Sequence, residues 1–175
     1  MKKFGTMLIM CVLLMAVMPS DSLTKENGLS EEAKKVYKET ENAYDDFKKQ
    51  RTVSGPHVRR NQDGFTVLVN LVSVMSKDSK TYALVFATVS SDWTFFRTAY
   101  DRHGKEQTII RGESSVSGGN CIETYVVLLD KEYFDKAQDG GIAIRVYGRG
   151  GKQTTITLSE CYVKGYFKKL KEIDR

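Results

Sequence analysis

Acidic and histidine side chains are the groups in this chain that could support catalysis. Its two histidines, His57 and His103, fall in polar segments that indicate a linker and a turn. Carboxylates are plentiful between residues 92 and 132, but they form no motif of recognised spacing. We therefore predict no catalytic residues and no enzyme activity. The alternative is a hydrolase of the cell envelope that uses two carboxylates brought together only in three dimensions.

Glu123 is the carboxylate whose neighbours are most informative. It lies two residues after Cys121 in a stretch rich in β-branched and apolar residues, so both side chains share one face of a predicted strand. We expect an exposed strand carboxylate without a special role. The alternative, which follows from the shared face, is that Glu123 is partly buried and needs a partner.

The cysteines favour a structural bond over metal binding. Cys11 lies in an apolar N-terminal run, and removal of that run leaves Cys121 and Cys161. An even count in an oxidising compartment predicts a disulfide, which the chain-entropy model values at roughly 4 kcal/mol. The alternative is a pair of separate buried thiols. Because no paired cysteine spacing and no adjacent histidine occurs, we predict no metal site.

The glycine-rich basic segment 148–152 lacks the spacing and the hydroxyl residue of a phosphate-binding loop. It predicts a hairpin turn, and we expect no cofactor.

An aromatic cluster offers a second kind of chemistry, which is stacking. Trp93 and Phe95 share one parity of a predicted strand, and Phe96 and Tyr100 share the other. At least one of these faces is expected to be core, while the other could stack a sugar ring or a partner side chain. Our candidate binding surface consists of Trp93, Phe96, Tyr100 and Glu123.

The N-terminus has the layout of a secretory signal peptide. Lys2 and Lys3 precede an uncharged apolar run over residues 4–18, which is shorter than the roughly 20 residues that span a bilayer. Small residues suit cleavage after Ser20 or Ser22. We predict export to the periplasm or the exterior, with no transmembrane span after cleavage. An uncleaved anchor and a buried N-terminal helix are the alternatives, and a lipid anchor at Cys11 is disfavoured because Met10 precedes it.

Charge says little about partners. The net charge of +5 is mild, and helix ends account for much of the lysine clustering. The functional interpretation is a weak preference for an anionic envelope polymer or lipid headgroups. An envelope protein is the other partner class, and the absence of any nucleic-acid-binding motif argues against nucleic acid.

The remaining elements are expected in a simple order. Residues 29–51 predict a helix with Ser30 as N-cap, because apolar residues recur at spacings of three and four. A polar linker is predicted over residues 52–64, and a loop is predicted over residues 112–120. Helices are predicted over residues 131–138 and over the segment that follows Ser159, with Ser159 as its N-cap. Strands are predicted over residues 65–75, 81–89, 93–100, 105–110, 122–129, 142–147 and 153–158.

These elements indicate a mostly β protein of the α+β class with a helix at each end. Hairpin-length connections favour antiparallel pairing, so we expect a β-sandwich or a bent sheet of about seven strands. The predicted organisation is a signal peptide over residues 1–22, a helical segment over 23–51, a linker over 52–64, and a β-rich domain with its C-terminal helix over 65–175.

Residues 121–129, 131–134, 141–148 and 162–167, together with 91–93 and 100–105, resemble a group of uncharacterised bacterial exported or lipoprotein domains. The resemblance covers about residues 65–170 and implies a fold and a compartment, without an activity. That group places a second cysteine in the loop before Cys121. Here residues 114–120 contain no cysteine, so a disulfide within this loop cannot form and Cys121 would need Cys161 as its partner.

The sequence thus predicts an exported, non-catalytic binding or interaction domain of the cell envelope. The alternatives are a secreted effector or inhibitor of another protein, and the carboxylate-dependent hydrolase.

Overall fold

A computed structural model describes residues 29–174 of the chain. The helices are α1 (Glu31–Glu39), α2 (Lys131–Lys136) and α3 (Glu160–Ile173), with 3-10 turns η2 (Ala137–Asp139) and η3 (Arg149–Gly151). The strands are β1 (Glu41–Asp45), β2 (Gln50–Ser54), β3 (Val58–Gln62), β4 (Phe65–Met75), β5 (Lys80–Ser90), β6 (Thr98–Asp101), β7 (Glu106–Ser117), β8 (Asn120–Leu129), β9 (Ile142–Tyr147) and β10 (Gln153–Leu158). The predicted signal peptide lies outside the described residues.

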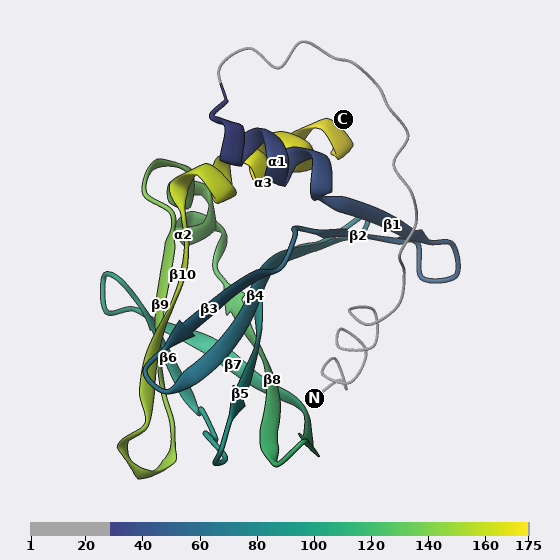
Figure 1. Cartoon of the computed structure of the whole chain (residues 1–175). Helices are drawn as coiled ribbons and strands as arrows, with labels where there is room; N and C mark the ends of the chain where they lie inside the picture. The colour runs from purple at the N-terminus through teal and green to yellow at the C-terminus, as the bar shows by residue number, and fades with distance from the viewer. Residues whose placement is uncertain (1–28, 175) are drawn as a thin grey trace.

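All ten strands belong to one antiparallel sheet that curls into half a barrel (Figure 1). The strand order is β1-β2-β4-β5-β8-β7-β6-β9-β10, and β3 also pairs with β4. The α+β class and the bent antiparallel sheet are confirmed. The sandwich alternative and the count of about seven strands are wrong, because segments 41–62 add three strands to the same sheet.

The core lies inside the curl and beneath the helices. Alternate residues of β4, β5 and β8 face it, as the period of two requires, and α3 covers one end with Tyr162, Tyr166 and Phe167. Ser159 caps α3 by accepting a hydrogen bond from the Tyr162 amide, as predicted. In Figure 1, α1 lies beside α3 across the upper end of the sheet. No helix within residues 29–174 is long and apolar enough to cross a membrane.

The predicted N-terminal helix over residues 29–51 is more than twice as long as the helix that forms, α1. It begins after Ser30 as expected, but it ends at Glu39, and the chain turns at Thr40 into the β1–β2 hairpin. Tyr44 and Phe47 share the helical spacing of the buried residues, yet they are 53% and 100% exposed. The physical reason is long-range pairing: β2 forms a ladder with β4, which no local spacing reveals.

The predicted linker over residues 52–64 is also wrong in part. It contains the end of β2 and all of β3, and both strands pair with β4. Residues 55–57 pass between them. A Cβ at Gly55 would lie 2.3 Å from the Tyr162 hydroxyl oxygen, so only glycine lets the backbone approach α3 here.

Two further boundaries differ from the prediction. The predicted loop over residues 112–120 is mostly strand, because β7 continues to Ser117 and turns into β8 through Gly118 and Gly119, which have positive φ. A bulge between Arg111 and Ser114 interrupts the ladder and accounts for the missing alternation. Conversely, the predicted strand over residues 93–100 begins only at Thr98.

The predicted disulfide is absent, since Cys121 and Cys161 are both free. Cys121 is the second residue of β8, while Cys161 is the second residue of α3. At about 3.3 Å per residue, Cys121 lies about 26 Å along β8 from Leu129, the end that leads into α2. Disulfides need Cα atoms within about 7 Å, so these cysteines are separate thiols.

Candidate functional site

Glu123 is the buried charge around which the most elaborate local structure forms. Its side chain is 1% exposed and points into the core face of β8, so the expected exposed carboxylate is wrong and the alternative from the spacing to Cys121 is confirmed. Its Oε2 accepts hydrogen bonds from the Thr94 amide at 2.5 Å and the Thr94 hydroxyl at 2.6 Å. Its Oε1 accepts hydrogen bonds from the Tyr125 hydroxyl at 2.8 Å and the Phe95 amide at 3.3 Å. One carboxylate therefore organises residues 94 and 95 of the loop between β5 and β6.

The electrostatics of this cluster keep Glu123 ionised. Burial raises the pKa of Glu123, but the hydrogen bonds from Thr94, Tyr125 and Phe95 outweigh burial and leave the pKa below its usual value. The Nη2 atom of Arg111 lies 3.1 Å from Oε1 and adds an opposite charge. Burial also raises the pKa of Tyr125 to about 12, so its hydroxyl stays protonated and can donate.

The loop holds Phe95 in a conformation that bulky residues rarely adopt. Its φ is +46°, in the left-handed region. Such a residue costs on the order of 1–3 kcal/mol and persists only where surrounding contacts over-determine it, often at functional sites. Here those contacts are the Glu123 hydrogen bonds and the guanidinium of Arg111, whose Cζ lies 4.6 Å from the centroid of the Phe95 ring. The Trp93 ring lies 6.0 Å from the same centroid, and both rings are half-buried.

The turn between β9 and β10 packs against this loop. The Arg149 amide donates to the Thr94 carbonyl oxygen at 3.1 Å, and Lys152 Nζ donates to the Trp93 carbonyl oxygen at the same distance. A Cβ at Gly148 would lie 2.2 Å from the Thr94 carbonyl oxygen, so glycine is required for this approach. We call the resulting region the aromatic–basic surface; it consists of Trp93, Phe95, Arg97, Arg111, Arg149 and Lys152.

The structure divides the four residues of the predicted binding surface. Trp93 lies on the aromatic–basic surface, and Glu123 lies beneath it. Phe96 belongs to the core, with its ring against those of Phe65, Phe86 and Tyr125. Tyr100 is half-buried on β6 and packs edge-on against Tyr147 of β9.

Sequence reasoning missed Phe95 and Arg111 as members of the site. The shared parity of Trp93 and Phe95 was the available signal for Phe95. No sequence signal marks Arg111, because its contact with Phe95 and Glu123 is made across the sheet.

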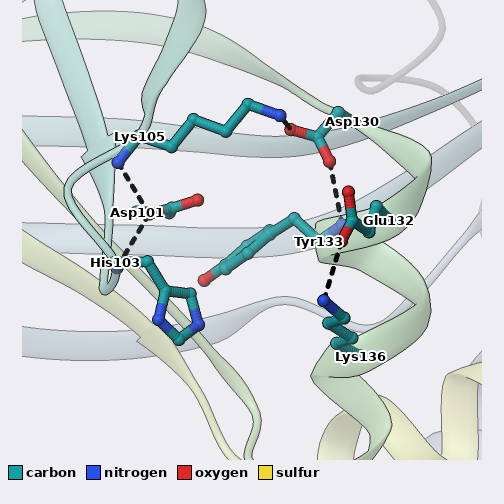
Figure 2. Close-up of a pocket in the computed structure, with 7 residues that line it drawn as sticks. All are labelled: Asp101, His103, Lys105, Asp130, Glu132, Tyr133 and Lys136. Atoms are coloured by element: carbon teal, nitrogen blue, oxygen red, sulfur yellow. Dashed lines mark hydrogen bonds and ion pairs between the residues drawn. The ribbon is translucent and has the colours of Figure 1, made fainter.

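A separate pocket of about 220 Å³ gathers several of the predicted carboxylates and His103 (Figure 2). Its lining comes from the β6–β7 turn and the start of α2, and comprises Asp101, His103, Lys105, Asp130, Glu132, Tyr133 and Lys136.

Each acid in this pocket already serves the local fold. Asp101 accepts hydrogen bonds from the amides of His103 and Lys105 at 2.8 and 3.0 Å and so closes the β6–β7 turn. Asp130 caps α2 through the Tyr133 amide and pairs with Lys105 at 2.8 Å. The third acid, Glu132, forms an ion pair with Lys136, which Figure 2 shows.

Two of the three acids that line the pocket have a pKa below the usual value. The hydrogen bond from Lys105 lowers the pKa of Asp130, and that from Lys136 lowers the pKa of Glu132. A carboxylate-dependent hydrolase needs the opposite shift in one acid of its pair. Within residues 29–174, no cluster of three or more His, Cys, Asp or Glu side chains could hold a metal ion. His57 and His103 are both exposed, on the β2–β3 connection and the β6–β7 turn.

Comparison of the chain with protein-family models, curated proteins and solved structures finds no significant match. The resemblance to bacterial exported domains therefore stays a prediction.

Proposed function

We propose that this chain is an exported, non-catalytic binding domain of the cell envelope, and that the aromatic–basic surface is its binding face. The observation that carries the proposal is the strained Phe95, held half-exposed beside Trp93 by a buried, ionised glutamate. Strain of this kind is retained where it presents a side chain for a purpose. The acids of the pocket support the same conclusion, since they are paired for structure rather than poised for proton transfer.

The export half of the proposal rests on the basic start, the apolar run and the small residues at Ser20 and Ser22. The test is N-terminal sequencing of the chain recovered from the envelope or the medium of an expressing bacterial cell. We expect it to begin at Asp21 or Leu23. A chain recovered only from the cytoplasm and beginning at Met1 contradicts export.

The binding half is tested by retention on an envelope preparation. The chain lacking residues 1–22 is compared with the double variant W93A/F95A, each verified as folded by circular dichroism. We expect the double variant to lose at least about tenfold in retention, because stacking area is removed from the proposed face. The control is F47A, which removes the fully exposed aromatic ring at the tip of the β1–β2 hairpin. Equal retention of all three proteins refutes the proposed binding face.

A further inference from the structure

We infer that the ligand of the aromatic–basic surface is an acidic polysaccharide, meaning a chain of sugar rings that carry carboxylate or phosphate groups. This inference rests on the proposed function and specifies its partner class. It draws on the two half-buried rings, the cations of the same surface and the separate segments that supply them.

The two rings provide a preformed stacking platform. Trp93 and Phe95 lie two positions apart in the same loop, with ring centroids 6.0 Å apart and planes inclined by 34°. Their backbone is anchored by the Glu123 hydrogen bonds and by Lys152 at the Trp93 carbonyl oxygen. A sugar ring presents an apolar C–H face that packs on such rings, and a platform that is already ordered avoids much of the entropy cost of binding.

The 91–97 loop and the 148–152 turn contain the cations Arg97, Arg149 and Lys152 against one carboxylate, Asp92. Arg97 and Arg149 are exposed and form no ion pair within residues 29–174. Lys152 is 3.8 Å from the largely exposed carboxylate of Asp92, which is a weak pairing. Arg111 is 40% exposed even though it contacts buried Glu123. Arginine side chains bind carboxylate and phosphate groups through paired hydrogen bonds, so this surplus suits a ligand with repeated acidic groups.

The shape of the surface favours an extended polymer. The rings and cations come from three separate segments, which are the 91–97 loop, the 148–152 turn and β7 with Arg111, so a ligand that contacts all of them must reach from one segment to the next. The pocket of Figure 2 is built from other residues and shares none with this surface. Single-stranded nucleic acid also combines stacking with phosphate charge, but the proposed export places the chain among envelope polymers.

The test uses the chain lacking residues 1–22 and affinity electrophoresis in gels that contain a dissolved polymer. The probes are polygalacturonate, which carries carboxylates, phosphomannan, which carries phosphates, and dextran, which is uncharged. Oligo(dT) is run as the nucleic-acid competitor. We expect retardation by polygalacturonate, phosphomannan or both, and none by dextran.

Variants then locate the binding. R97A/R149A removes two cations from the surface, and R59A/R60A removes two exposed cations from β3 as the matched control. We expect R97A/R149A to weaken binding at least about fivefold and to reduce its salt dependence, and W93A to weaken it about tenfold. R59A/R60A should bind like the wild type.

Several results overturn the inference. The first is an equal loss of binding in R97A/R149A and R59A/R60A, and the second is retardation by dextran equal to that by the acidic polymers. The others are tighter binding of oligo(dT) than of either acidic polysaccharide, and no retardation by polygalacturonate or phosphomannan. If polysaccharide binding fails while envelope retention still depends on Trp93 and Phe95, the proposed function stands and only the partner class is wrong. If both fail, the proposed function falls as well.

Discussion

Replacing Glu123 with glutamine tests whether a buried charge holds the 91–97 loop in place. The carboxylate accepts hydrogen bonds from Thr94, Phe95 and Tyr125 and pairs with Arg111. An amide retains only one acceptor oxygen, and its NH2 group must face donors on the other side. Donors left unsatisfied in a buried site cost about 1–3 kcal/mol each. We expect Glu123→Gln to lower the free energy of unfolding by about 2–4 kcal/mol, a large part of the ~5–15 kcal/mol of a typical domain.

The assay is urea unfolding, followed by circular dichroism and by the fluorescence of Trp93, the one tryptophan of the chain. Trp93 lies in the loop, so its signal should change at lower urea in the variant than in the wild type. The matched control is Glu113→Gln, an exposed carboxylate on β7, which should change stability by less than about 0.5 kcal/mol. If Glu123→Gln costs no more than this control, the carboxylate does not organise the loop.

The pH dependence provides an independent check of the same idea. Burial raises the pKa of Glu123, but hydrogen bonds leave its folded value below the ordinary 4.5. The ionised carboxylate therefore contributes its stability above pH 4.5, and this contribution is lost as the pH falls through the lower folded pKa. Because glutamine does not titrate, the stability difference between wild type and variant should be full at pH 7 and shrink below about pH 4.5. A difference that grows with acidity contradicts the assigned direction.

Three further predictions follow from packing and from the thiols. Gly165→Ala should destabilise the fold by about 1–3 kcal/mol in the same urea assay, because its Cβ would lie 2.2 Å from the Ala33 carbonyl oxygen where α3 crosses α1; an unchanged midpoint contradicts this close approach. Tyr125→Phe should lower the free energy of unfolding by about 1–3 kcal/mol, because the Tyr125 hydroxyl accepts a hydrogen bond from the buried Phe96 amide and donates one to Glu123. A loss below about 0.5 kcal/mol rules this role out. Thiol titration of the unfolded, unreduced chain without its leader should find Cys121 and Cys161 both free, with Cys161 the faster to react when folded because Cys121 is buried; a mass two hydrogens below the reduced chain would show the bond instead.

Periodic patterns within short stretches were predicted well. The alternation of β9 and β10 and the helical spacing of α3 each arise from burial of one face, which the neighbouring residues indicate directly. The same reasoning failed over residues 41–51, where Ala43, Tyr44 and Phe47 continue a helical spacing by coincidence. Ala43 and Tyr44 lie in β1, which pairs with β2, and β2 in turn pairs with residues of β4 that lie 18 to 24 positions further along the chain.

The candidate site was predicted in part for a similar reason. Burial of Glu123 could be raised as an alternative because its face follows from Cys121, two residues earlier. Its partners come from the 91–97 loop and from Arg111, so their identity depends on how distant segments meet. The left-handed backbone of Phe95 has no sequence signal, because phenylalanine adopts it only under outside constraint.

The sequence by itself determined the antiparallel, mostly β class and the C-terminal helix with its Ser159 cap. These properties depend on contacts and periodicities a few residues long. The tertiary structure alone decided that ten strands form one curled sheet, that Cys121 and Cys161 are separate thiols, and that Trp93 and Phe95 form a half-buried platform. Strand order and the partners of a buried charge are set by which distant segments pack together, because only that packing supplies the missing hydrogen bonds and excludes water.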